Sequence, residues 1–152
     1  MTTETKHGFG PHMMLDCYGC PGEKLSDLDL IFSTLDTLPA RIGLTKIMPP
    51  HVFKYSGEVP EDWGVSGVVL IAESHISIHT FPEKEHAFID IFSCQDFDTD
   101  FARRLLLETF GATDHEVVLV NRGLEFPKNI RRAAGPVNRE RQGISERPRI
   151  YH

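Results

Sequence analysis

The stretch from residue 64 to residue 94 constrains the fold most, because it reads as two β-strands joined by a very short bend. Residues 67–72 form a short apolar run, which is typical of a buried strand. In residues 75–80, histidine and serine alternate with isoleucine, so the polar side chains share one face of a second strand. The two strands meet near Glu73 and Ser74. We therefore expect Ser74 to lie at a bend, where its hydroxyl can be exposed.

Two amphipathic helices and further strands surround this hairpin. Large apolar residues recur at steps of three and four between Leu25 and Leu38, and again between Phe101 and Phe110, which is the helical period. Strand character is found in residues 11–18, 44–48 (with a possible continuation at 51–55), 87–94 and 116–121. The pattern predicts an α+β fold, a two-layer sandwich of a mainly antiparallel sheet with two helices on one face.

Length and charge predict one domain followed by a basic tail. The 152 residues are enough for a single domain with its own core. Residues 1–127 carry 9 Lys and Arg against 20 Asp and Glu, whereas residues 128–152 carry 7 against 2 and lack apolar periodicity. We expect residues 1–127 to form the domain and residues 128–152 to form a flexible tail. The acidic body argues against a nucleic-acid partner, because phosphate binding needs a basic surface.

The sequence also argues against a membrane location and a metal site. No apolar run approaches the roughly 20 residues that a spanning helix needs, and the N-terminus lacks a signal peptide, so we expect a cytoplasmic protein without a membrane partner. Cys17 and Cys20 have C-x-x-C spacing, but no second pair completes a zinc site. On one strand His75 and His79 would be roughly 13 Å apart, too far to share one ion.

The polar residues of the hairpin fall at mutual spacings that resemble a known signature. The matching positions are Ser66, Glu73-Ser74-His75, His79-Thr80, Pro82-Glu83 and Cys94. They look like the small prokaryotic S-adenosylmethionine decarboxylases, and the resemblance covers about residues 9 to 127. Those enzymes cleave themselves at a Glu-Ser bond and carry a covalent pyruvoyl cofactor. The resemblance implies cleavage between Glu73 and Ser74, which gives chains 1–73 and 74–152 and converts Ser74 into the pyruvoyl group.

The resemblance also implies a role for each polar residue. The pyruvoyl group at residue 74 forms a Schiff base with the substrate amine and accepts the electrons released when carbon dioxide leaves. Ser66 assists the acyl shift that starts maturation, and His79 accepts the proton from the α-carbon of Ser74. Cys94 donates the proton that completes decarboxylation, since an ordinary thiol is largely protonated at neutral pH. Glu83 binds the ribose hydroxyls, and His75 is left without a role.

Substrate choice is less constrained than the reaction. Phe81 and Ile76 are candidate substrate-binding residues, and either Phe53 or Trp63 could supply the second aromatic face around an adenine. The family usually has tryptophan where this chain has Phe81, and the acidic segment 56–62 is longer than usual. S-adenosylmethionine is the favoured substrate, and arginine or ornithine, which some family members decarboxylate, is the alternative. Either product would enter polyamine synthesis.

The resemblance further implies an assembly. Family members work as dimers of the cleaved protomer with active sites at or near the interface, so we expect a homodimer that binds a small-molecule substrate. A non-enzymatic relative that keeps the fold without cleavage is the remaining alternative. The joint presence of Ser66, Ser74, His79 and Cys94 counts against it.

Overall fold

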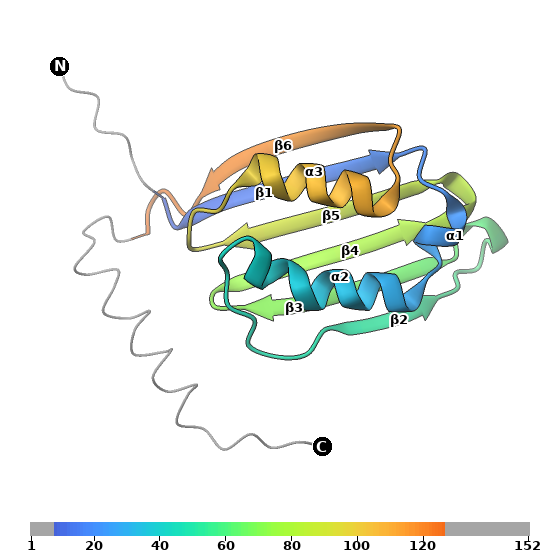
Figure 1. The fold of residues 1–152 in the computed structure, drawn as a ribbon, viewed down its shortest axis with the longest axis horizontal. Helices are drawn as coiled ribbons and strands as arrows, with labels where there is room; N and C mark the ends of the chain where they lie inside the picture. Colours follow the sequence, from blue (N-terminus) through green and yellow to red (C-terminus); the bar gives the residue numbers. More distant parts are fainter. Residues whose placement is uncertain (1–7, 127–152) are drawn as a thin grey trace.

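A single antiparallel sheet forms the body of the protein. The computed structural model describes residues 8–126; residues 1–7 and the predicted tail, 128–152, lie outside the described part. The described strands form a six-stranded sheet with the order β2-β3-β4-β5-β1-β6, and each neighbouring pair is antiparallel (Figure 1). The strands are β1 (Gly10–Tyr18), β2 (His51–Tyr55), β3 (Gly64–Ile71), β4 (Ser74–Phe81), β5 (His86–Ser93) and β6 (Asp114–Arg122).

The two long helices lie on the same face of this sheet (Figure 1). They are α2 (Leu28–Arg41) and α3 (Thr99–Phe110), and the first is preceded by a one-turn helix, α1 (Gly22–Leu25). Asp27 and Asp98 cap the two long helices, each accepting a hydrogen bond from a backbone N–H of the first turn. The predicted α+β sandwich is confirmed. No helix within residues 8–126 is long and apolar enough to cross a membrane.

The sheet has one covered face and one open face. On β4, Ile76 and Ile78 are fully buried against the helices, whereas His75 and His79 point to the opposite, open face. Gly67 of β3 lets α2 approach closely, since a Cβ there would lie 2.6 Å from a methyl carbon of Leu35. The predicted alternation of residues 75–80 is therefore confirmed, and the chemistry of the hairpin is left on the open face.

The strand predicted at residues 44–48 is wrong. This segment makes only an isolated bridge, from Lys46 to Ile71, and the edge strand is β2, which follows the two prolines. Pro49 and Pro50 have no N–H to donate to a ladder, so a continuous strand cannot run through them. The possible continuation at residues 51–55 proves to be the actual strand, and the preceding residues lie antiparallel to the end of β3 at the single bridge.

Candidate active site

The hairpin of β3 and β4 positions the site residues. Its turn consists of Ala72 and Glu73, with Ile71 opposite Ser74 at the closed end and Ser66 opposite His79 further along. The predicted bend before Ser74 is confirmed, although Ser74 is half-buried rather than fully exposed. The Glu73–Ser74 bond thus lies where two strands join.

The backbone around this bond is strained and held by the neighbouring strand end. Ser74 has a φ of 129°, a conformation that L-residues with a side chain rarely adopt. The Glu73 carbonyl oxygen accepts a hydrogen bond of 3.1 Å from the backbone N–H of Cys94. The Glu73 N–H in turn donates to the Cys94 sulfur at 3.4 Å. Cys94 therefore contacts Glu73 through both its backbone and its side chain.

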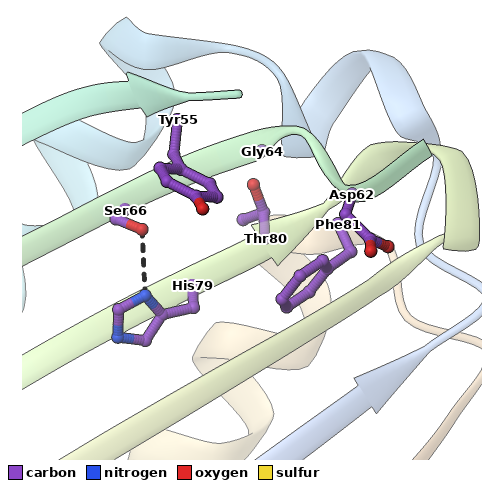
Figure 2. Close-up of a pocket in the computed structure, with 7 residues that line it drawn as sticks. All are labelled: Tyr55, Asp62, Gly64, Ser66, His79, Thr80 and Phe81. Atoms are coloured by element: carbon purple, nitrogen blue, oxygen red, sulfur yellow. Dashed lines mark hydrogen bonds between the residues drawn. The ribbon is translucent and has the colours of Figure 1, made fainter. Parts of the chain in front are cut away.

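A second cluster lies further along the hairpin. Ser66 Oγ and His79 Nδ1 are 3.0 Å apart, within hydrogen-bonding distance, and both belong to the open face. They border a pocket of about 270 Å³, into which the ring of Phe81 also projects, as Figure 2 shows. The lining residues are Tyr55, Asp62, Gly64, Ser66, His79, Thr80 and Phe81.

Two loops that contact each other lie next to the Phe81 end of this pocket. One contains the 3₁₀ helix η1 (Pro60–Asp62) and the other contains η2 (Pro82–Lys84). Lys84 forms an ion pair with Asp62, and the indole N–H of Trp63 donates to the Glu83 carboxylate at 3.2 Å. These two contacts therefore hold the end of the acidic segment 56–62, and Trp63 after it, against the loop that carries Glu83.

The structure brings the predicted site residues together in two groups. Glu73, Ser74 and Cys94 form one group, and the Ser66–His79 pair with its pocket forms the other. His79 follows Ser74 by five residues on the same strand, which is roughly 16 Å at about 3.3 Å per residue. No imidazole reaches across that distance, so within one chain His79 does not contact Ser74.

Comparison with known proteins identifies the family. The family model described as S-adenosylmethionine decarboxylase matches residues 11–123. The chain belongs to this family. The S-adenosylmethionine decarboxylase proenzyme of Geobacillus kaustophilus is 35% identical over 124 residues, 82% of this chain and 94% of that one. The corresponding proenzyme of Pyrococcus furiosus is 36% identical over 117 residues, 76% of this chain and 80% of that one.

A solved structure agrees with the sequence comparison. The crystal structure of the adenosylmethionine decarboxylase from Aquifex aeolicus matches with a TM-score of 0.61 and 30% identity, covering 76% of this chain and 92% of that one. The predicted membership of the S-adenosylmethionine decarboxylase family is thereby confirmed. These relatives are named as decarboxylases of S-adenosylmethionine or adenosylmethionine, not of arginine or ornithine.

The predicted substrate-binding residues do not all lie at the pocket. Phe81 lines the pocket, whereas Glu83 lies in the adjacent loop, where its carboxylate accepts a hydrogen bond from Trp63. Phe53 is exposed on the open face of β2. The side chain of Ile76 is fully buried among the core residues, so it faces away from the open face that carries the pocket.

Sequence reasoning missed the surroundings of His75. Its Nδ1 lies 3.1 Å from Ser74 Oγ, and its ring packs edge-on to Phe92 with centroids 6.0 Å apart. His12 and Arg122 come from strands that are distant in sequence, and they lie on the same face. The alternation of residues 75–80 indicated the face of His75, but only the strand order could bring these neighbours to it. Within residues 8–126 no three His, Cys, Asp or Glu side chains are grouped to hold a metal ion.

Proposed function

We propose that this protein is an S-adenosylmethionine decarboxylase that makes a pyruvoyl cofactor from Ser74 by breaking its own Glu73–Ser74 bond. The arrangement of this bond is the observation that carries the proposal. Ser74 is held at a φ of 129°, and the carbonyl it would attack already accepts a 3.1 Å hydrogen bond from the Cys94 N–H. Strain at Ser74 favours a change of bonding there, and the N–H is placed to stabilise the oxyanion that forms.

The chemistry of maturation needs only this chain and water. Ser74 Oγ bonds to the Glu73 carbonyl carbon, the C–N bond breaks, and the nitrogen takes a proton, which leaves an ester. Loss of the proton on the Ser74 α-carbon then expels the Glu73 carboxylate and leaves dehydroalanine. Its enamine tautomerises and is hydrolysed, which releases ammonia and leaves a pyruvoyl group at residue 74. The Glu73 carboxylate becomes the end of the upstream fragment.

After maturation, the residues around position 74 would bind substrate and move one proton. The pyruvoyl carbonyl supplies an electron sink for the bond that releases carbon dioxide. Cys94 remains next to the cleaved position and would return a proton to the α-carbon of the product. Glu83 and Phe81 would bind the ribose and adenine of the substrate, as carboxylate oxygens suit a diol and an aromatic ring suits a base.

The distance between the two groups of residues supports a site shared by two copies of the chain. In the proposed homodimer, the partner's His79 and the partner's Ser66 would act on Ser74. The open face also exposes large apolar side chains that a second copy would cover. They are Phe53, Tyr55, Leu70, Phe88, Val118 and Val120.

The pocket favours S-adenosylmethionine over a basic amino acid. Asp62, from the acidic segment 56–62, lines the pocket, and its carboxylate already forms an ion pair with Lys84. A guanidinium or second ammonium would have to displace that lysine. The cytoplasmic location and the absence of nucleic-acid and membrane partners stay predictions.

Denaturing electrophoresis with intact-mass measurement tests the proposal. The purified chain should give two fragments, 1–73 and 74–152, and Ser74→Ala should stay whole. Purified fragments should release carbon dioxide from S-adenosylmethionine in preference to arginine or ornithine. An uncut wild-type chain with an unmodified Ser74 would refute self-cleavage.

A mixing experiment tests the shared site. His79→Ala carrying a size tag and Ser74→Ala are expressed separately and together, and neither should mature alone. In mixed dimers the tagged chain keeps its Ser74 and gains an intact His79 from its partner, so it should be cut. If the tagged chain stays uncut in verified mixed dimers, His79 does not act across the interface.

A further inference from the structure

We propose that His75 is the base that takes the hydroxyl proton of Ser74 when the hydroxyl attacks the Glu73 carbonyl. The inference rests on the proposed self-cleavage and adds a second histidine with a separate task. His79 would accept the α-carbon proton later, whereas His75 would act in the first step. Serine hydroxyls are weak nucleophiles until a neighbouring base removes the proton.

The contact between the two side chains carries the inference. His75 Nδ1 lies 3.1 Å from Ser74 Oγ, within the range for direct proton transfer. His79 of the same chain is roughly 16 Å further along the strand. Cys94 contacts Glu73 on the other side of the scissile bond, so it is occupied with the carbonyl and the amide. Within one chain, His75 is therefore the residue placed to receive the hydroxyl proton.

The surroundings of His75 keep its imidazole able to accept a proton. Burial lowers the pKa of His75 below its ordinary value of 6.5, the neighbouring His12 and Arg122 lower it as well, and Asp90 opposes them. Asp90 is engaged by His12, whose Nε2 lies 3.2 Å from the carboxylate.

The ladder partners of His75 on the two adjacent strands carry no charge. On β3 it faces Leu70, and on β5 it faces Phe92. A neutral His75 at pH 7 follows, which is the form that a general base needs.

The step balances within the chain. The Ser74 Oγ–H proton passes to His75 Nδ1 as Oγ bonds to the Glu73 carbonyl carbon. The resulting imidazolium can then return a proton to the Ser74 nitrogen when the C–N bond breaks. His75 is left neutral and the chain holds an ester, so no other reactant is required.

His75→Asn separates a base from a hydrogen-bonding residue. The asparagine amide oxygen can still accept from the Ser74 hydroxyl, but the amide does not take up a proton at neutral pH. Chains are made by cell-free synthesis and sampled over time on denaturing gels. We expect His75→Asn to mature at least ~10²-fold more slowly than wild type, the usual contribution of a general base. His51→Asn, at an exposed position on β2, should mature at the wild-type rate.

Hydroxylamine shows which step is blocked, because it cuts esters and spares ordinary amides. His79→Ala should accumulate the ester and release both fragments when hydroxylamine is added. The double variant His75→Asn/His79→Ala should release them at least ~10²-fold more slowly, because the ester forms too slowly. Matching far-UV circular dichroism and thermal midpoints would confirm that the variants are folded.

Three results would overturn the inference. The first is maturation of folded His75→Asn at the wild-type rate. The second is equal fragment release from the single and double variants under hydroxylamine. The third is a misfolded His75→Asn, which would assign His75 to the fold. A wild-type chain that fails to cleave would instead refute the proposed function.

Discussion

The two ends of β4 are built for different tasks. At Ser74 the backbone is strained, the side chain is half-buried, and the end of β5 holds the peptide bond through Cys94. Near Phe81 the strand borders a pocket, and its His79 lies within hydrogen-bonding distance of Ser66 on β3. In the proposed reaction, one end undergoes bond cleavage, and the other binds a ligand and accepts a proton. Neither end alone holds all the residues of that reaction, as expected if two copies of the chain share the site.

Different neighbours support the two ends. The Ser74 end depends on β5, which is a regular central strand of the sheet. The Phe81 end depends on irregular loops, in which Trp63 contacts Glu83 and Lys84 pairs with Asp62. Loops tolerate sequence change better than central strands do. We therefore expect changes at the first end to stop chemistry and changes in the loops at the second end to alter binding.

The largest expected effect is that of Cys94→Ser on turnover. A hydroxyl at residue 94 can still accept the hydrogen bond from the Glu73 N–H, but it is a much weaker acid than a thiol. Maturation should continue, because the Cys94 backbone N–H that supports the Glu73 carbonyl is retained. Decarboxylation should fall by ~10²- to 10⁴-fold in kcat, the range for loss of a general acid. Carbon dioxide release from the purified, cleaved variant measures it.

Cys20→Ser is the matched control for this change. Cys20 is fully buried, whereas Cys94 is half-buried, and Cys20 belongs to the core rather than to the cleavage site. Its substitution should lower stability without lowering the kcat of the folded fraction. Wild-type turnover in Cys94→Ser would show that another group returns the proton.

A smaller effect is expected from Thr80→Val, beneath the pocket end of β4. The buried Thr80 hydroxyl donates to the Leu25 carbonyl at 2.7 Å and accepts from the Val65 N–H at 3.0 Å. Valine has the same shape but would leave both backbone groups without this partner. The free energy of unfolding should fall by about 1–3 kcal/mol, measured by urea denaturation of the Ser74→Ala chain so that every molecule is uncut.

Ser77→Ala gives the comparison for Thr80→Val on the open face of the same strand. Ser77 is half-buried, and its removal should change the free energy of unfolding by less than about 0.5 kcal/mol. Equal losses for the two variants would mean that the covered and open faces do not differ in how they support β4.

Local patterns in the sequence predicted most of the strands and helices, but they did not predict that the site residues lie in two separate groups. The alternation of residues 75–80 placed His79 on the open face correctly, because the side-chain period of a strand is fixed. The same geometry puts His79 roughly 16 Å from Ser74, although the two belong to one short motif. A motif that is continuous in sequence therefore resembled a single site, whereas the structure separates its residues into two groups.

Features that depend on strand order could not be predicted. His75 gains His12 and Arg122 as neighbours only because β1 and β6 extend the sheet beyond β5. No local pattern near His75 contains that information. The failed strand at residues 44–48 has a local cause, since two prolines moved the edge strand to the residues that follow them.

The smallest expected effect, that of Trp63→Phe, tests how the pocket end holds Glu83. Phenylalanine keeps an aromatic ring but removes the N–H that donates to the Glu83 carboxylate at 3.2 Å. The loss of one hydrogen bond worth about 0.5–1.5 kcal/mol should raise KM by roughly 2- to 12-fold, with kcat and maturation unchanged. Glu83→Ala and the double variant Trp63→Phe/Glu83→Ala show whether Trp63 acts on substrate binding through Glu83. If Trp63 acts through Glu83, Trp63→Phe should raise KM in the wild-type background and add nothing to Glu83→Ala. An equal rise in both backgrounds would mean that Trp63 contacts the substrate directly, and the aromatic face that sequence analysis left open between Phe53 and Trp63 would then be assigned to Trp63.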